Sequence, residues 1–124
     1  MNLSVKDIRT FISGGDRFDI TVKFYQEIGF TLQFKNNDLA GLGLDGCNFF
    51  LQRYPNKWME GNFMMALEVE SVDDWWQFLQ PLNLEAKYPG VKVKEPMNYP
   101  WGKREIHLID PVGVLWHIAC NIPT

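Results

Sequence analysis

Apolar residues in the first half of the chain follow two spacings, one typical of a helix and one typical of strands. Four residues recur at three- and four-residue intervals: Thr21, Phe24, Tyr25 and Ile28. This spacing predicts an amphipathic helix over residues 17–28, ended by Gly29. Runs rich in β-branched and aromatic residues predict strands at residues 5–13, 30–34, 39–44 and 47–54. Asp45-Gly46 joins the last two strands as a two-residue hairpin turn, so the predicted element order is βαβββ.

The second half repeats this order. A strand is expected over residues 63–70, and Ser71 then begins a helix with acidic residues in its first turn. The buried stripe of that helix comprises Val72, Trp75, Trp76 and Leu79. The remaining strands are expected at residues 91–97, 103–109 and 114–121. The last two are joined by an Asp-Pro-Val-Gly sequence at residues 110–113, with Pro and Gly where a type I turn favours them.

The repetition indicates an internal duplication. Gly46 in the first hairpin matches Gly113 in the last, and the second copy carries an extra stretch that we expect within residues 87–100. One such unit cannot easily cover its own sheet, and this is a physical reason for pairing two of them. We therefore predict an α+β fold, with two βαβββ modules forming a half-open, curved mixed sheet. The 124 residues would form a single domain of two repeats, about 1–54 and 63–124, with a linker at about 55–62.

Composition and charge exclude several classes of protein. Apolar residues make up 46% of the chain, enough for a core without disulfide bonds, so Cys47 and Cys120 are expected as free thiols in a reducing cytosol. The net charge of -3 is spread without a Lys/Arg stripe, which argues against a nucleic-acid partner. No apolar run has the length of a membrane span, and the N-terminus lacks a signal-peptide pattern. We expect a cytoplasmic protein without a membrane or nucleic-acid partner.

Several short motifs together resemble a known superfamily. They are Phe24-Tyr25, Ile28-Gly29-Phe30, Asp38-Leu39-Ala40-Gly41-Leu42, Phe49-Phe50-Leu51-Gln52, Pro100-Trp101-Gly102, Arg104-Glu105 and Asp110-Pro111-Val112-Gly113. In this combination the chain is similar to the glyoxalase, bleomycin-resistance and extradiol-dioxygenase proteins, also called the vicinal oxygen chelate superfamily. The Pro-Trp-Gly and Arg-Glu motifs most resemble the bleomycin-resistance branch. That resemblance implies a homodimer with ligand clefts at the subunit interface.

The resemblance also implies where a divalent metal would bind. Enzymes of the superfamily hold it with side chains near the first strand of each copy and on the last strands, and the matching positions here are Asp7, Phe50, Met64 and His117. Only His117 and Asp7 are ligand types, and they do not make the convergent set that such chemistry requires. We therefore predict no metal and no cofactor, with His117 and Asp7 as the remaining metal candidates.

The two histidines do not extend this set if the last hairpin is regular. A two-residue turn would place His117 opposite Ile106 and His107 opposite Trp116. His117 would then line the concave side with Leu115, Ala119, Ile106 and Leu108. His107 would point toward the helices with Trp116 and Ile118. No nucleophile-elbow or nucleotide-binding motif offers another catalytic reading.

Without a metal, the concave face is predicted to be a mainly apolar trough for a small molecule. Its ligand-binding residues are expected to be Asn48, Phe50, Gln52, His117 and Asp38, with Trp58, Tyr99 and Trp101 from the loops. The leading hypothesis is a metal-free, homodimeric binding protein that sequesters a planar or cationic, antibiotic-like compound. One alternative is a metal-dependent glyoxalase- or dioxygenase-type enzyme using His117 and Asp7. A second alternative is a dimerising module whose cleft is filled by side chains.

Overall fold

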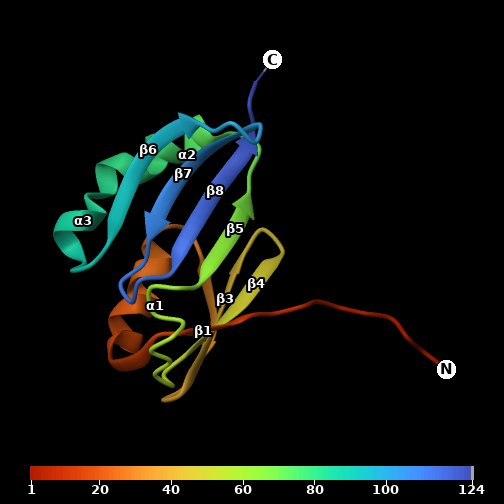
Figure 1. Cartoon of the computed structure of the whole chain (residues 1–124). Coiled ribbons are helices and arrows are strands. Elements are labelled where there is room, and N and C mark those ends of the chain that lie inside the picture. The colour runs from red at the N-terminus through yellow and green to blue at the C-terminus, as the bar shows by residue number, and fades with distance from the viewer. Residues whose placement is uncertain (124) are drawn as a thin grey trace.

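The computed structural model describes residues 1–123, which form two four-stranded sheets flanked by helices (Figure 1). The first half contains β1 (Phe11–Ser13), a 3-10 turn (Gly15–Arg17), α1 (Phe18–Glu27), β2 (Thr31–Lys35), β3 (Leu39–Leu44) and β4 (Cys47–Gln52). Its strands lie in the order β1-β4-β3-β2, and we call them the N-terminal sheet. β1 is parallel to β4, and the other neighbours are antiparallel.

The second half has the same topology. It contains β5 (Met64–Glu68), α2 (Val72–Leu79), a 3-10 turn (Gln80–Leu82), α3 (Leu84–Lys87), β6 (Lys92–Asn98), β7 (Lys103–Ile109) and β8 (Leu115–Asn121). The strand order β5-β8-β7-β6, which we call the C-terminal sheet, matches that of the first sheet strand for strand. The predicted pair of βαβββ modules is therefore confirmed.

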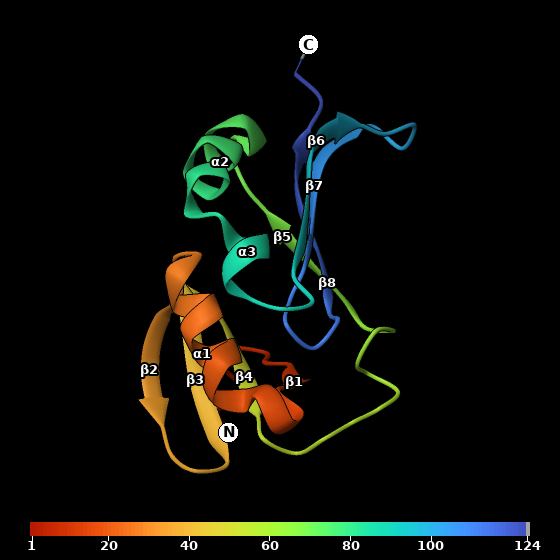
Figure 2. The same ribbon diagram turned by 90° about the vertical axis from the view of Figure 1, so that its left-hand side faces the viewer.

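One core joins the two modules. α1 lies against the N-terminal sheet, while α2 and α3 lie on one side of the C-terminal sheet (Figure 2). Tyr25 of α1 packs edge-on against Phe49 of β4 and Trp116 of β8, with ring centroids 5.0 and 5.8 Å away. Its hydroxyl donates to Asp110 Oδ2 at 2.5 Å and accepts the Trp116 indole N–H at 2.9 Å. The covered faces of both sheets thus share side chains from both halves.

The other face of each sheet is open. Alternation along β4 buries Phe49 and Leu51 against α1 and leaves Asn48, Phe50 and Gln52 half-buried on the opposite side. We use "open face" for this side of either sheet. None of the described helices has the length and apolar character needed to cross a bilayer.

Several predicted elements are confirmed closely. The strands at 39–44 and 103–109 have the expected bounds, and the Ser71 hydroxyl caps α2 by accepting the Asp74 backbone N–H at 3.1 Å. Asp45 and Gly46 both have positive φ, 50° and 83°, as a two-residue type I′ turn requires. The extra stretch of the second module lies only partly within 87–100, because the helical residues 80–87 contribute to it as well.

The first strand is shorter than predicted. Only Phe11–Ser13 pairs with β4, and the ten residues before it form neither helix nor strand. The N-terminal end of this segment extends away from the body (Figure 1). Four apolar side chains of the segment are exposed, namely Met1, Leu3, Val5 and Ile8. Phe11 lies opposite Phe50 in a parallel register and β4 begins at Cys47, so β4 has no residues to pair with positions before 8.

The predicted register of the last hairpin is wrong by one residue. His107 lies opposite His117, and Ile106 lies opposite Ile118. Asp110 N–H bonds to Val114 O at 2.9 Å, and Gly113, with φ of 100°, closes a three-residue loop in place of the expected two-residue turn. A one-residue shift exchanges the faces of a strand. Both histidines therefore share the open face, whereas Ile106 and Leu108 are buried on the covered face.

Candidate functional site

A carboxylate and two imidazoles meet on the open face of the C-terminal sheet. Glu105 and His107 are two residues apart on β7, so both point to this face, and the β8 residue His117 lies directly opposite His107. Glu105 Oε1 is 2.8 Å from His107 Nε2 and 2.9 Å from His117 Nδ1. The second carboxylate oxygen, Oε2, accepts the Trp101 indole N–H at 2.8 Å. We call Glu105, His107 and His117 the Glu-His-His cluster.

The Glu105 carboxylate is ionised in this setting. Its residue is only 5% exposed, and burial alone would raise the pKa of the carboxyl. Hydrogen bonds from Trp101, His117 and His107 outweigh burial and lower the pKa of Glu105 to about 2. A buried negative charge held by three N–H donors fixes the orientation of all three rings around it.

An aromatic stack extends from this cluster to solvent. The Tyr99 ring lies between Trp101 and His107, with centroid distances of 4.7 and 5.0 Å and interplanar angles of 17° and 18°. The turn that carries it is closed by a bond from Gly102 N–H to Tyr99 O at 3.1 Å, and Gly102 has a φ of 87°. Trp101 at the outer end remains 61% exposed. Its free ring face is a platform on which another planar group can stack.

The open face of the N-terminal sheet is aromatic rather than polar. Phe50 packs between Phe11 at 4.9 Å and Phe34 at 6.0 Å, and the Arg9 guanidinium lies 5.2 Å from its ring centroid. Phe34 crosses the sheet over Gly41, where an added Cβ would come within 2.4 Å of the Phe34 ring. Gly41 thus makes room for this aromatic row.

Asn48 and Asp7 lie together at one end of that face. The Asn48 side-chain N–H donates to Asp7 Oδ2 at 2.9 Å, and its carbonyl oxygen accepts from Gln33 at 2.8 Å. Hydrogen bonds from Asn48 and Arg9 lower the pKa of Asp7. These contacts hold Asp7 against the edge of the N-terminal sheet.

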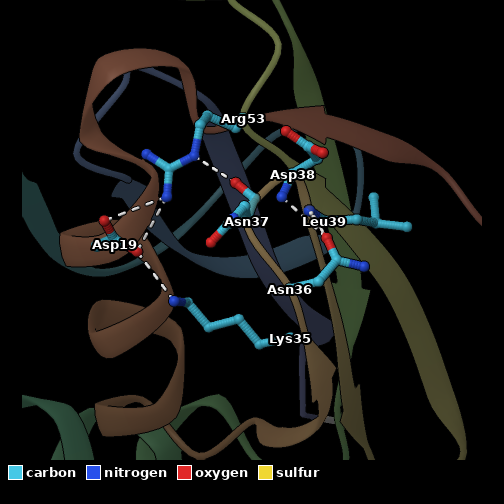
Figure 3. Close-up of polar contacts among 7 residues, drawn as sticks. All are labelled: Asp19, Lys35, Asn36, Asn37, Asp38, Leu39 and Arg53. Carbon is cyan, nitrogen blue, oxygen red and sulfur yellow. Dashed lines mark hydrogen bonds and ion pairs between the residues drawn. The ribbon is translucent and has the colours of Figure 1, made fainter.

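Asp38 and Gln52 lie at the opposite end, where they line a shallow hollow of about 310 Å³ with Arg53 and Tyr54. Figure 3 shows how this corner is built: Asn36 accepts the backbone N–H groups of Asp38 and Leu39, at 2.9 and 3.0 Å. The Arg53 side chain bonds to Asn37 O and to Asp19, and Asp19 also pairs with Lys35 at 3.0 Å. Among residues 1–123, no ion pair engages the Asp38 carboxylate.

The predicted site residues therefore fall into separate groups. Tyr99, Trp101 and His117 gather around the Glu-His-His cluster, whereas Phe50, Asn48, Gln52 and Asp38 belong to the N-terminal sheet and its edge. Trp58, 68% exposed, lies in the linker away from both. Within the described part of the chain, no hydrogen bond or aromatic pair joins the two sheets' open faces.

Sequence reasoning missed Glu105 and His107 as site residues. The Glu-x-His spacing on a strand places both side chains on one face, and this signal was present. The wrong hairpin register concealed it, because it assigned His107 to the helix side.

The metal positions implied by the family do not converge in this chain. Asp7 lies in the segment before β1 and bonds to Asn48 of β4, whereas His117 lies on β8 of the other sheet, and the neighbouring family positions hold Phe50 and Met64. In the described residues, the three donors that do lie together are Glu105, His107 and His117, whose ligand atoms are all within 4.8 Å of one another. The family's own donor set therefore does not fit, and a different set is present.

Comparison with known proteins places this geometry in a family context. Residues 14–118 match the model of the Glyoxalase/Bleomycin resistance protein/Dioxygenase superfamily. A search of curated protein sequences gave no significant match. Similar solved structures include a bleomycin-binding protein complexed with bleomycin, with a TM-score of 0.79 and 19% identity over 95% of this chain and 100% of that chain.

Two further structures show the breadth of this similarity. A bleomycin resistance determinant encoded on transposon Tn5 has a TM-score of 0.76 and 20% identity, and the match covers 96% of this chain and 100% of that one. A lactoylglutathione lyase from Agrobacterium tumefaciens has a TM-score of 0.68 and 14% identity, covering 94% and 95%. At these identities the likeness establishes the fold alone.

Proposed function

The chain belongs to the Glyoxalase/Bleomycin resistance protein/Dioxygenase superfamily, and from this premise we propose that it binds a planar, cationic small molecule on the open face of the C-terminal sheet. The observation that carries the proposal is the exposed outer face of Trp101 at the end of its stack with Tyr99 and His107. The fold shared with proteins that bind bleomycin supports an antibiotic of that kind as the ligand. The biological consequence would be resistance by sequestration in the cytoplasm.

The chemistry of the stack favours this ligand class. Trp101 is held by its N–H bond to Glu105, so little side-chain freedom remains to be lost when a planar ring covers it. The negative face of an indole attracts a cation as well as a flat ring. The ionised Glu105 beside it and the net charge of -3 favour a cation further.

We further propose that the ligand site is completed in a homodimer. Apolar side chains on the open faces remain exposed, namely Phe11, Phe34, Met64 and Met97. A second copy would bury them, and it could set the N-terminal sheet of one chain against the C-terminal sheet of its partner. Phe50, Asn48 and Gln52 would then form the wall opposite Trp101, and the separate groups of predicted residues would become one cleft.

The test is calorimetric titration of the purified protein with bleomycin, compared with the variant Trp101→Ala. Loss of a central aromatic anchor typically costs more than about 1.4 kcal/mol, so we expect binding at least about tenfold weaker. Trp75→Phe is the matched control, because Trp75 lies on α2 and packs against Phe78 on the helix side. That variant should bind as the wild type does.

Two results would contradict the proposal. One is the absence of any heat of binding or tryptophan quenching with the wild type at micromolar bleomycin. The other is an equal loss of affinity in Trp101→Ala and Trp75→Phe, which would indicate a general structural effect. Sedimentation velocity of the same samples tests the shared cleft, because a protein that binds only as a monomer has no such cleft.

A further inference from the structure

We propose that Glu105, His107 and His117 form a binding site for a divalent transition-metal ion, beside the ligand platform at Trp101 and distinct from it. The three side chains supply two imidazole nitrogens and one carboxylate oxygen from a single antiparallel hairpin. This donor combination suits Zn²⁺, Co²⁺, Ni²⁺ and Fe²⁺, whereas Mg²⁺ and Ca²⁺ prefer an all-oxygen set. Only His117 coincides with a position where the family resemblance places a ligand.

The two contacts of Glu105 within the cluster are slightly shorter than the spacing of ligands around an ion. Glu105 Oε1 lies 2.8 Å from His107 Nε2 and 2.9 Å from His117 Nδ1. Ligand atoms about 2.0–2.2 Å from an ion are separated from one another by about 3.0–3.4 Å, depending on the coordination geometry. The two Glu105 contacts would each need to lengthen by about a few tenths of an ångström to admit an ion in place of the shared protons, and all three ligand atoms already lie within 4.8 Å of one another.

The outer nitrogens of both rings have partners that fit a metal-bound state. His107 Nδ1 faces Tyr99 Oη at 3.5 Å, and His117 Nε2 faces Met64 Sδ at 3.5 Å. With an ion on the inner nitrogens, each ring keeps one N–H on its outer nitrogen and can donate it to an acceptor. The Met64 sulfur is a weak acceptor, so it can take the N–H that a metal-bound His117 keeps on Nε2.

The carboxylate of the cluster is buried, and its two imidazoles are partly exposed on the open face. Glu105 is buried, whereas the side chains of His107 and His117 are 22% and 26% exposed. The neighbouring strand positions hold small residues, Ala66 opposite His117 and Ala119 opposite Glu105. Three ligands from one side leave coordination positions free toward this open face, as a site that exchanges its outer ligands requires.

Nearby charges do not occupy the cluster. Lys103 pairs with Glu68, and Lys94, opposite His107 on β6, borders an open hollow of about 690 Å³ that His107 also lines. Lys94 therefore lies beside the cluster. Its ammonium group would attract an anionic ligand that fills a free coordination position of the bound ion. The Glu105 carboxylate is the negative group that faces both imidazoles.

The experiment is titration of tag-free, chelator-treated protein with ZnCl₂ by calorimetry, and with CoCl₂ by visible absorption of the bound ion. We expect one ion per chain, and no binding of MgCl₂ at the same concentrations. His107→Gln and Glu105→Gln should each weaken Zn²⁺ binding by at least about tenfold, because each removes one of three protein ligands. Asp7→Asn is the matched control and should bind Zn²⁺ as the wild type does.

Circular dichroism checks that each variant is folded. The thermal midpoint is then measured with and without ZnCl₂, because a variant that folds but does not bind the ion shows no shift. Absence of Zn²⁺ binding by the wild type would overturn the proposal. So would loss of binding in Asp7→Asn with retention in His107→Gln, which would assign the ion to the family positions. Since the probe is the metal alone, neither outcome depends on whether bleomycin binds at Trp101.

Discussion

The two sheets carry different chemistry at the same places on their open faces. Across the N-terminal sheet, one row of paired residues reads Phe11, Phe50, Gly41 and Phe34. The equivalent row of the C-terminal sheet reads Ala66, His117, His107 and Lys94. An apolar row of the first kind gains from being covered, whereas the second presents donor atoms to a ligand. This difference supports the proposal that the open face of the first module packs against a partner and that of the second binds a ligand.

The turns differ in a related way. The first hairpin closes with two residues, Asp45 and Gly46, and the last closes with a three-residue loop ending at Gly113. Because one residue of register exchanges the faces of a strand, a shorter second turn would send His107 toward the helices. The loop length, more than the presence of histidines, determines that this module has a Glu-His-His cluster. Substitutions at three places test this difference between the modules: Tyr25 in the shared core, Asp110 in the last turn, and the hairpin glycines Gly46 and Gly113.

The largest effect is expected from Tyr25→Phe, because Tyr25 supports both modules from the covered side. The change leaves Asp110 Oδ2 and the Trp116 indole N–H buried without this partner. Each unsatisfied group costs about 1–3 kcal/mol, so the free energy of unfolding should fall by about 3–4 kcal/mol in urea denaturation. If the modules depend on each other, the transition remains single. A loss of cooperativity with no change in midpoint would contradict a shared core.

Tyr88→Phe is the control for this prediction. The Tyr88 hydroxyl also bonds to a carboxylate, Glu27 Oε1 at 2.6 Å, but Glu27 lies near the surface and is paired with Lys87. The remaining Glu27 oxygen can turn to water, so the loss should stay near about 1 kcal/mol. Equal losses in the two variants would show that Tyr25 has no special role between the modules.

A second prediction concerns the buried carboxyl of the last turn. Burial raises the pKa of Asp110 to about 6, despite hydrogen bonds from Tyr25 and from backbone N–H groups that lower it. The folded chain then keeps a proton up to about pH 6 that the unfolded chain releases near pH 4. Stability from this group is therefore present below pH 4 and lost as the pH rises through 6.

Urea denaturation of the wild type and Asp110→Asn at pH 4 and pH 7 measures this effect. The stability of the wild type relative to the variant should fall by about 3 kcal/mol over that interval. Asp45→Asn, in the exposed turn of the first hairpin, is the matched control for removing a turn carboxyl. A constant difference between wild type and Asp110→Asn would mean that Asp110 titrates alike in the folded and unfolded chain.

Local chemistry was enough to predict most of the fold. The Asp45-Gly46 turn, the Ser71 cap and the strand at 103–109 each depend on residues close in sequence, and each is confirmed. The N-terminal strand was overestimated because its length depends on a partner strand far along the chain. Apolar alternation alone does not supply that information.

The site was only half predictable for the same reason. Trp101, Tyr99 and His117 were expected as ligand-binding residues, but the partner that Trp101 and His117 share is Glu105, to which Trp101 folds back across the turn. That contact and the face to which His107 points both depend on the register of the last hairpin. The Asp-Pro-Val-Gly sequence does not determine this register. Such a sequence can make either a two-residue turn or a three-residue loop closed by a left-handed glycine.

The two hairpin glycines provide the last and smallest test, and the one that addresses the register itself. Gly113 has a φ of 100°, and an added Cβ would lie 2.9 Å from the backbone nitrogen of Gly61. Gly46 has a φ of 83° but nothing within 4 Å of such a Cβ. Alanine at either position meets backbone strain of about 1 kcal/mol, and only at Gly113 must the neighbouring backbone also move.

We therefore expect Gly113→Ala to lower the free energy of unfolding by about 2–3 kcal/mol and Gly46→Ala by about 1 kcal/mol, measured by urea denaturation. A three-residue loop that cannot keep its left-handed glycine can relieve strain by slipping to the two-residue register, which would separate His107 from His117. Histidine NMR signals that change in Gly113→Ala but not in Gly46→Ala would record that slip. Equal destabilisation with unchanged histidines would mean that strand packing, and not the turn, holds the two rings on one face.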